Sequence, residues 1–189
     1  GAGISGILAA KNAAKNNLKT LLVDEKNGLG GSTIYQNREF NKIENQSSSD
    51  WLKKEIKELR NIKNLEIKTR TSVAAFHGYN YLLARENLTD HLEKKDKLGK
   101  IRQRLLKIRA KKVILATGAL ERPLIFNNND RPGIMLSSAV KKYADFYGVV
   151  SGKKNVFFTN NDSAYESALC LHNKGIKVEA VIDIRESSN

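Results

Sequence analysis

The first six residues, Gly1-Ala2-Gly3-Ile4-Ser5-Gly6, have the G-x-G-x-x-G spacing of a loop that binds the two phosphates of a dinucleotide. In such a loop the first glycine permits a tight turn into a helix and the second lets the backbone approach the pyrophosphate. The third lets the helix pack closely on a sheet. The helix that follows presents unpaired N–H groups and its positive dipole end to the phosphates. We therefore predict that Gly1, Gly3, Ile4, Ser5 and Gly6 bind a dinucleotide.

An acidic pair follows this loop at the distance that a ribose-binding residue requires. The apolar run 21–23 ends in Asp24 and Glu25, and Asp24 lies 18 residues after Gly6. An acidic side chain at the end of the second strand of a dinucleotide-binding unit accepts hydrogen bonds from a ribose hydroxyl. Asp24 is the first candidate for this role and Glu25 is the second. Residues 7–14 predict a helix of small residues between the two strands.

Two further segments offer small residues to a cofactor. One is a glycine pair shortly after the acidic pair. The other is an Ala-Thr-Gly sequence that ends an apolar run, and this run predicts a strand over residues 112–119. Glycines that merely allow a positive φ in a loop would look the same, so the glycine pair alone does not decide the matter. The cofactor-lining residues predicted from these segments are Gly30, Gly31, Ser32, Ala116, Thr117 and Gly118.

The sequence offers no catalytic or metal-binding group of its own. The three histidines, His77, His91 and His172, are widely spaced and are not accompanied by cysteine or carboxylate in a metal-ligand pattern. No G-x-S-x-G nucleophile sequence is present. When a cofactor carries out redox chemistry, the protein mainly binds and orients it. We therefore expect a nucleotide-holding module without catalytic residues and without a metal.

The chain is strongly basic, with 33 Lys and Arg against 20 Asp and Glu residues and a formal net charge of +13. Such a charge favours acidic partners, including nucleic acid. The basic residues are nevertheless spread along the chain, with no zinc-finger spacing and no aromatic RNA-binding motif. We therefore expect a solvated surface and no nucleic-acid partner. A docking face for an acidic subunit remains the alternative.

Cysteine usage and hydropathy indicate the compartment. Cys170 is the only cysteine, so the 189 residues hold neither a disulfide nor a dithiol pair, and we expect a buried helical thiol in a reducing, cytoplasmic environment. No apolar run approaches the roughly 20 residues that span a bilayer, so we expect no membrane partner.

Hydrophobic periodicity predicts an α/β fold. A helix over residues 50–61, capped by Ser48 or Ser49, follows a loop-like stretch at 33–50. Strands are predicted at 65–69, 73–76, 79–85 and 102–109, with a charged turn at 89–100. The last three form an antiparallel meander, at about 73–110, inserted into a parallel sheet.

A second strand–helix–strand unit is predicted near the end of the chain. A helix over 137–147 and a link at 148–154 lead to a strand at 155–158, a helix at 163–173 ended by Gly175, and a strand at 178–184. The loop of this unit, Thr159-Asn160-Asn161-Asp162, contains no glycine, and Asp162 would repel phosphate, so we expect no nucleotide here. We predict a dinucleotide-binding domain at 1–150 and the start of a second, Rossmann-like domain at 151–189. Because the glycine loop stands at residue 1, we interpret the sequence as part of a longer protein whose first strand lies upstream.

These residues together resemble the α subunit of heterotetrameric sarcosine oxidase. The resemblance rests on residues 1–6, 23–25, 29–32, 79–81, 89–92, 102–123, 126–135 and 158–165. It implies a Rossmann-like FAD/NAD(P)-binding fold with two dinucleotide domains, in which the α subunit holds NAD. It also implies a heterotetramer in which sarcosine is oxidised at FAD in the β subunit and an FMN lies between α and β. Oxygen accepts the electrons and tetrahydrofolate accepts the one-carbon unit.

The predicted function is thus the NAD-binding part of a sarcosine oxidase-type oxidoreductase that demethylates sarcosine to glycine. One alternative is a stand-alone FAD-dependent reductase that uses NAD(P)H, with FAD in the first site. Such an enzyme needs an intact second glycine loop, which residues 159–162 do not provide. Another is a subunit of a related proline dehydrogenase or opine oxidase. A scaffold that binds no nucleotide is the third, and the intact first loop argues against it.

Overall fold

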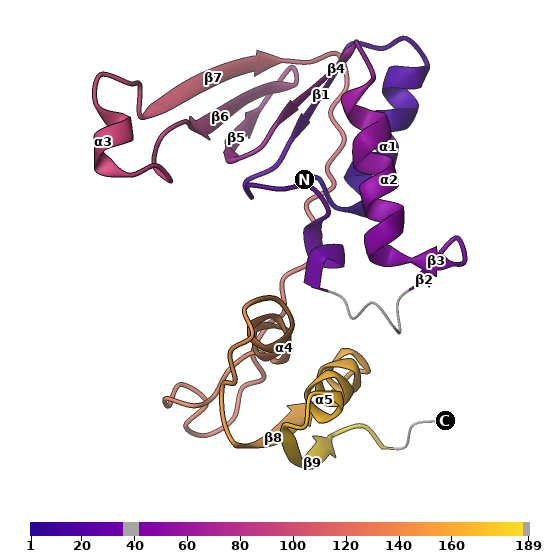
Figure 1. Cartoon of the computed structure of the whole chain (residues 1–189), viewed down its shortest axis with the longest axis vertical. Coiled ribbons are helices and arrows are strands. Elements are labelled where there is room, and N and C mark those ends of the chain that lie inside the picture. Colours follow the sequence, from indigo (N-terminus) through magenta and orange to yellow (C-terminus); the bar gives the residue numbers. More distant parts are fainter. Residues whose placement is uncertain (36–41, 187–189) are drawn as a thin grey trace. The chain divides into compact units, whose positions relative to one another are not determined.

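A computed structural model describes residues 1–35 and 42–186 (Figure 1). Their contacts divide into two compact units. The first comprises residues 1–33 and 42–118, and the second comprises residues 34–35 and 119–186 of the described chain. The predicted domain boundary near residue 150 stays a prediction, because dense contacts alone do not define a segment that folds independently.

The first unit is built on a parallel strand pair beside two helices. Strand β1 (Thr20–Val23) pairs in parallel with β4 (Leu65–Lys68), with Thr20 opposite Leu65. Helices α1 (Ile4–Lys15) and α2 (Ser48–Arg60) lie next to each other beside these strands (Figure 1). The helices bury apolar side chains that recur at helical spacing: Ile7, Ala10 and Ala14 on α1, and Trp51, Leu52 and Leu59 on α2. The helix predicted after the glycine loop and the strand predicted after that helix are confirmed.

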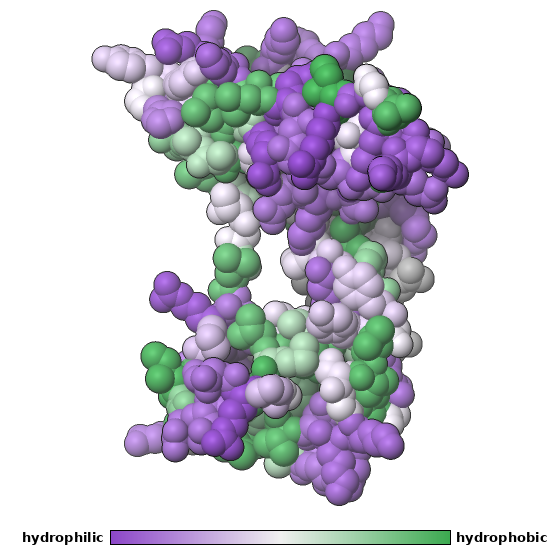
Figure 2. All heavy atoms as spheres, turned by 90° about the vertical axis from the view of Figure 1, so that its left-hand side faces the viewer, coloured by the Kyte–Doolittle hydropathy of each residue, from purple (hydrophilic) through white to green (hydrophobic). Residues whose placement is uncertain are grey.

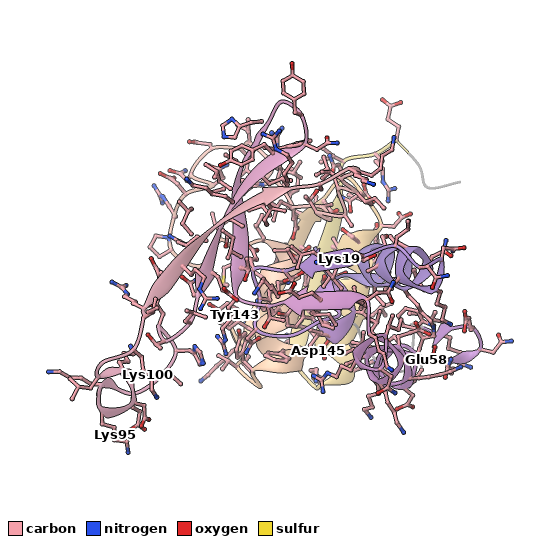
Figure 3. All side chains as sticks on the ribbon, turned by 90° about the horizontal axis from the view of Figure 1, so that it is seen from above. Lys19, Glu58, Lys95, Lys100, Tyr143 and Asp145 are labelled. Atoms are coloured by element: carbon pink, nitrogen blue, oxygen red, sulfur yellow. The ribbon has the colours of Figure 1, made fainter. Side chains whose placement is uncertain are left out.

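A half-buried ion pair joins the two helices. The Lys11 ammonium on α1 lies 2.7 Å from a carboxylate oxygen of Glu55 and 2.7 Å from one of Glu58, both on α2. Burial acts to lower the pKa of Lys11, but the hydrogen bonds to the two carboxylates outweigh it and raise this pKa overall. Glu58 is labelled in Figure 3 on the α2 helix. The acidic side of α2 is therefore turned toward α1.

The N-terminus of α2 differs by one residue from the prediction. The hydroxyl of Ser47 accepts a hydrogen bond from the backbone N–H of Asp50 at 3.2 Å and thus caps the helix. Ser48 and Ser49, the predicted caps, lie inside the first turn. Ser48 is instead buried in the core, with 1% of its surface exposed.

The predicted antiparallel meander is present. It consists of β5 (Thr71–His77), β6 (Tyr81–Asn87) and β7 (Gln103–Arg109), and β6 pairs with both neighbours. Val73, Ala84 and Leu106 lie opposite one another on one face of this sheet. The charged turn between β6 and β7 contains one helical turn, α3 (Lys94–Lys97), and Figure 3 shows Lys95 and Lys100 at this outer end.

Residues 33–50, predicted as a loop, contain regular structure in their described part. A 3-10 helix, η1 (Gly31–Tyr35), follows the glycine pair, and the short strands β2 (Lys42–Ile43) and β3 (Gln46–Ser47) form a hairpin before α2. The hairpin turn uses a positive φ at Glu44 and Asn45. Residues 36–41 of the predicted loop lie outside the described residues.

The strand predicted at 112–119 is not formed. This segment pairs with no other strand among the described residues, and its side chains Ile114 and Leu115 are 66% and 68% exposed. A strand requires a neighbour that accepts and donates its ladder hydrogen bonds, so an apolar sequence alone does not create one. Hydrophobic residues consequently reach the surface of the first unit, and they do so in the second as well (Figure 2).

The second unit confirms the predicted order of elements. Helix α4 (Ser137–Phe146) precedes β8 (Lys154–Thr159), α5 (Ser163–Asn173) and β9 (Lys177–Asp183), and β8 pairs in parallel with β9. The N–H of Gly175 donates to His172 O at 2.9 Å and its φ is +73°, so this residue ends α5 as predicted. The core of the second unit contains Ala144, Phe157, Ala164, Ala168 and Leu171.

Cys170 is buried in α5, as predicted, with 2% of its surface exposed. Burial, together with the Asp145 carboxylate 3.1 Å from its sulfur, raises the pKa of the thiol to about 11. Asp145 is labelled on α4 in Figure 3. The thiol therefore stays protonated at neutral pH, which is the inert form. In the described part of the chain, no helix is both long and apolar enough to cross a bilayer.

Candidate dinucleotide site

The glycine loop forms a turn that only glycine permits at its two ends. A Cβ at Gly6 would overlap the carbonyl oxygen of Gly1, and a Cβ at Gly1 would overlap the carbonyl oxygen of Ala116. Both overlaps are with backbone atoms, which cannot swing away as a flexible side chain can. These two glycines are therefore required by the protein's own packing, whatever the loop binds.

Gly3, between them, has no such structural requirement. The nearest atom to a Cβ at Gly3 would be Gly31 Cα at 3.9 Å, and its φ of −72° and ψ of −175° suit any residue. Gly3 is also the N-cap of α1, where no side chain accepts a hydrogen bond and no acidic residue stands in the first turn. Since Ile7 N donates to Gly3 O, the N–H groups of residues 4–6 have no acceptor within the helix. The helix N-terminus is thus bare and positively polarised.

The glycine pair packs directly on this loop. The Gly30 N–H donates to Ala2 O at 2.7 Å. Gly31 has a φ of +58°, and a Cβ there would lie 2.8 Å from Gly3 Cα. The positive φ and the close approach both exclude other residues at this position. The second glycine segment therefore forms one wall beside the bare N-terminus.

Asp24 ties the loop to the end of β1. It is 8% exposed, and its Oδ2 accepts a hydrogen bond from Ala2 N at 2.5 Å while its Oδ1 accepts one from Lys26 N at 2.8 Å. An ionised carboxylate offers about four lone-pair positions, so these two bonds leave room for a hydroxyl donor. Glu25 is exposed. Of the two predicted acids, only Asp24 contacts the glycine loop in the described structure.

The third predicted segment also reaches the loop. Ala116 and Thr117 lie against Gly1. Gly118 has a φ of +75°, and a Cβ at this residue would meet open space. The structure thus brings three segments, at Asp24, at residues 30–31 and at residues 116–117, to one glycine loop. Their predicted binding role stays a prediction. The residues are Gly1, Gly3, Ile4, Ser5, Gly6, Asp24, Glu25, Gly30, Gly31, Ser32, Ala116, Thr117 and Gly118.

Thr33 is a residue of this site region that the sequence did not reveal. It is 4% exposed, its backbone N–H donates to Gly30 O at 3.1 Å, and its hydroxyl has no hydrogen-bond partner. A buried hydroxyl without a partner is unfavourable and is normally satisfied by water or a ligand. The sequence signal for Thr33 is its position two residues after the glycine pair. Residues 33–50 are predicted as a loop, and Thr33 is therefore not among the predicted site residues.

In the second unit, one backbone N–H at the corresponding helix N-terminus has a side-chain partner. The Asn161 side-chain oxygen accepts hydrogen bonds from the backbone N–H of Ser163 at 3.0 Å and from its hydroxyl at 2.5 Å. Arg185 lies 2.7 Å from Asp162 and 2.6 Å from Asp183, the acid that ends β9. Hydrogen bonds from Arg185 hold the pKa of Asp183 well below its usual range. The acid and the helix end both have internal partners.

Residues 1–180 match the family model for pyridine nucleotide-disulphide oxidoreductases, and the chain belongs to this family. It is therefore an oxidoreductase module with a dinucleotide-binding fold. In sequence it is homologous to sarcosine oxidase subunit alpha. It is 40% identical to that of Corynebacterium sp. strain P-1 over 98% of the chain and 35% identical to that of Rhizobium meliloti over 100%. The chain spans 19% of the length of each of these relatives.

Solved structures agree with this assignment. L-proline dehydrogenase from P. horikoshii superposes over 100% of the chain and 35% of its own, with a TM-score of 0.74 and 26% identity. Reduced Bacillus anthracis CoADR-RHD superposes over 96% of the chain and 31% of its own, with a TM-score of 0.50 and 14% identity, which shows a shared fold alone. In the described residues, no three His, Cys, Asp or Glu side chains gather as metal ligands.

Proposed function

We propose that the first unit holds an adenine dinucleotide, NAD in the first instance, within a sarcosine oxidase-type subunit. The observation that carries this proposal is the bare N-terminus of α1 at Gly3, next to Gly31 and the buried Asp24. Backbone that no side chain covers, at a helix end without a cap, is suited to a pyrophosphate. The residues present therefore fit the cofactor.

Each segment would have a distinct part in holding the dinucleotide. The N–H groups of residues 4–6 would donate to the phosphates, and Asp24 would accept from a ribose hydroxyl, with Glu25 as the second candidate. Residues 30–32 and residues 116–118 would form the walls of the dinucleotide site. When bound, the nicotinamide or flavin supplies hydride transfer. The protein would contribute the orientation of the cofactor, as is usual where a cofactor carries out the redox chemistry.

The reaction proposed for the complete protein follows from its relatives. They are named sarcosine oxidase subunit alpha, which supports a hetero-oligomer that oxidises sarcosine to glycine. FAD and FMN in that complex, oxygen as electron acceptor and tetrahydrofolate as one-carbon acceptor belong to the same proposal. The similarity to L-proline dehydrogenase supports a second candidate amine, proline, on the same architecture. An opine oxidase subunit is the third member of this group.

A stand-alone reductase is the less favoured function. It would need a second nucleotide site for NAD(P)H, and in the second unit Asn161 and Arg185 occupy the positions where phosphate and ribose would be recognised. The sole cysteine is buried with a raised pKa, so these residues also lack a dithiol relay.

The test is identification of the nucleotide carried by the full-length polypeptide. The protein is purified with its partners, denatured, and the released nucleotides are quantified by mass spectrometry, before and after Gly3→Val is introduced. One NAD per chain that disappears in the variant supports the proposal. Loss of FAD instead of NAD favours the reductase. If neither nucleotide depends on Gly3, the placement of the site is wrong.

A further inference from the structure

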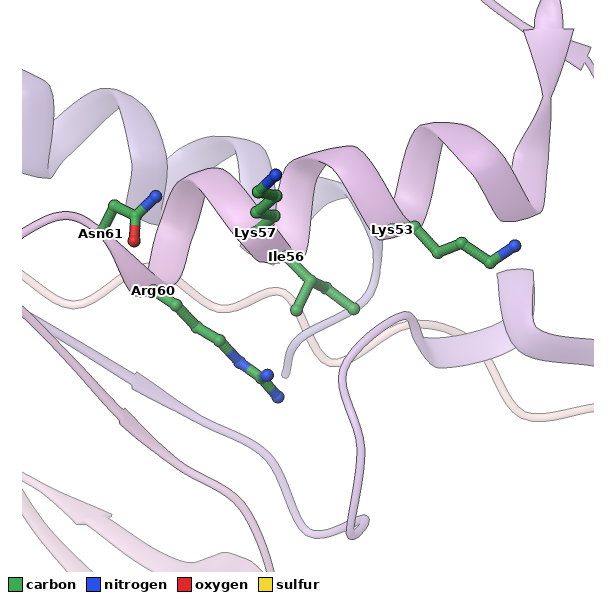
Figure 4. Close-up of a pocket in the computed structure, with 5 residues that line it drawn as sticks. All are labelled: Lys53, Ile56, Lys57, Arg60 and Asn61. Carbon is green, nitrogen blue, oxygen red and sulfur yellow. The ribbon is translucent and has the colours of Figure 1, made fainter.

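A groove runs along the basic side of α2. This side is distinct from the acidic side, where Glu55 and Glu58 contact α1. Lys53, Ile56, Lys57, Arg60 and Asn61 line its first part, and Figure 4 shows Ile56 and Arg60 projecting to the same side of the helix. Ile56 and Arg60 also line its second part, a hollow of about 410 Å³ that continues to the turn at 27–29 and to Ile67 and Thr69. We refer to these residues together as the α2 groove.

The charges of the α2 groove are all of one sign. Its charged residues are Lys53, Lys57 and Arg60, and no acidic residue lines it. Lys53 pairs with Asp50 at 3.2 Å. Within the described ranges, no carboxylate forms an ion pair with Lys57 or Arg60, because Glu55 and Glu58 are directed to Lys11. The groove therefore holds two cations without counter-charge.

Apolar side chains lie beside these cations. Ile56 is half-buried on the helix, and Leu29 and Ile67 lie in the second hollow. The two cations without a counter-charge, Lys57 and Arg60, are three residues apart on α2, about 4.5 Å at 1.5 Å per helical residue. This pattern of cations beside an apolar floor matches a polypeptide that presents carboxylates beside an apolar anchor.

We propose that the α2 groove docks an acidic, amphipathic segment of another polypeptide in the assembled protein. The apolar side chains of Ile56, Leu29 and Ile67 beside the cations favour a polypeptide over a free phosphate, which has no apolar part to bury there. No aromatic side chain lines the groove, so it lacks the stacking surface that single-stranded nucleic acid uses. The net charge of +13 also favours association with an acidic protein.

The experiment places a photo-crosslinking amino acid in the full-length protein, expressed with its natural partners. A benzophenone amino acid replaces Asn61, which lines the groove without adding charge, and Lys54, which is exposed on α2 outside the groove, is the control position. Adducts are sequenced by mass spectrometry. We expect an adduct from position 61, and none from position 54, to an acidic peptide of a different polypeptide.

Charge reversal then tests the chemistry of docking. Lys57→Glu with Arg60→Glu should lower the yield of this adduct at least tenfold, and reversal of the mapped carboxylates on the partner should restore it. Lys54→Glu with Lys63→Glu is the matched control and should leave the yield unchanged. If the charge-reversed chain does not fold, Lys57→Gln with Arg60→Gln gives the same test with a smaller fall. The proposal would be overturned if no adduct forms, or if the adduct is to nucleic acid or to a second copy of this chain. It would also be overturned if the adduct yield is insensitive to these charge changes.

Discussion

Two helix–strand segments of this chain, α1 with β1 and α5 with β9, have the same order of elements but differ at the N-terminus of the helix. In the first, α1 begins at Gly3 with no side-chain cap. In the second, Asn161 bonds to the first turn of α5, and Asp162 stands beside it, paired with Arg185. We therefore expect a few side chains at one turn, rather than the architecture, to decide whether a nucleotide binds.

The acid at the end of the strand that follows each of these helices differs in the same way. Asp24 bonds to two backbone N–H groups and retains lone pairs for a ribose. Asp183 instead accepts hydrogen bonds from Arg185 and from the Tyr165 hydroxyl at 3.0 Å. One acid organises an open loop and the other belongs to a closed ion-pair cluster.

The largest expected effect is that of Gly3→Val on binding. The side chain would occupy the space in front of the helix N-terminus, so we expect at least a 100-fold loss of dinucleotide affinity, about 2.7 kcal/mol or more. The melting temperature without ligand should change little, because no protein atom lies closer than 3.9 Å to the new Cβ. Gly28→Ala is the matched control, since its Cβ would meet open space. Calorimetric titration of both variants measures the difference, and unchanged affinity in Gly3→Val contradicts it.

Gly6→Ala should act on folding rather than on binding alone. Its Cβ would overlap Gly1 O, so the turn must shift, and an overpacked position of this kind typically lowers the free energy of unfolding by about 1–3 kcal/mol. Chemical denaturation of the ligand-free protein, compared with that of Gly3→Ala, provides the measurement. Equal stability of the two variants would show that Gly6 is not a packing requirement.

Asp24→Ala should weaken dinucleotide binding by about 1–3 kcal/mol, which is the usual range for a lost hydrogen bond to a charged group. Because Asp24 also holds Ala2, the ligand-free loop should become less stable as well. Glu25→Ala is the control on the neighbouring exposed residue. A loss of affinity confined to Glu25→Ala would transfer the ribose-binding role to that residue.

Thr33→Val tests whether the buried hydroxyl serves the ligand. If it donates to the dinucleotide, the isosteric change should reduce affinity by about 1 kcal/mol, near fivefold, without lowering the stability of the ligand-free protein. Thr33→Ser, which keeps the hydroxyl, should retain affinity. Equal affinity of the valine and serine variants would show that the hydroxyl has no part in binding.

The sequence revealed those features that depend on local spacing. Residues 163–173 form a helix as predicted, and the glycine loop and Asp24 come together because strand, turn and helix follow one another along the chain. Features that depend on distant neighbours were not accessible. The segment at 112–119 has a strand-like composition but no partner strand, and the burial of Thr33 arises from packing.

The smallest expected effect on nucleotide binding is that of Arg185→Ala, which tests the closed state of the second segment. Removal of the guanidinium leaves Asn161 on the helix N-terminus and Asp162 beside it, so no nucleotide affinity should appear.

The dependence of stability on pH should change in Arg185→Ala. Arg185 lowers the pKa of Asp183, so its stabilising effect is present above the ordinary carboxyl value of 3.8 and is lost as pH falls through the lowered value. In the variant most of this contribution is absent, so the stability difference between wild type and variant should be largest near neutral pH and shrink as pH falls below 3.8, measured by chemical denaturation at several pH values in parallel with titration by NAD and NADH. Appearance of nucleotide binding in Arg185→Ala would show that the ion pair alone closes the second site, and that the difference between the two segments lies in one removable side chain rather than in the loop.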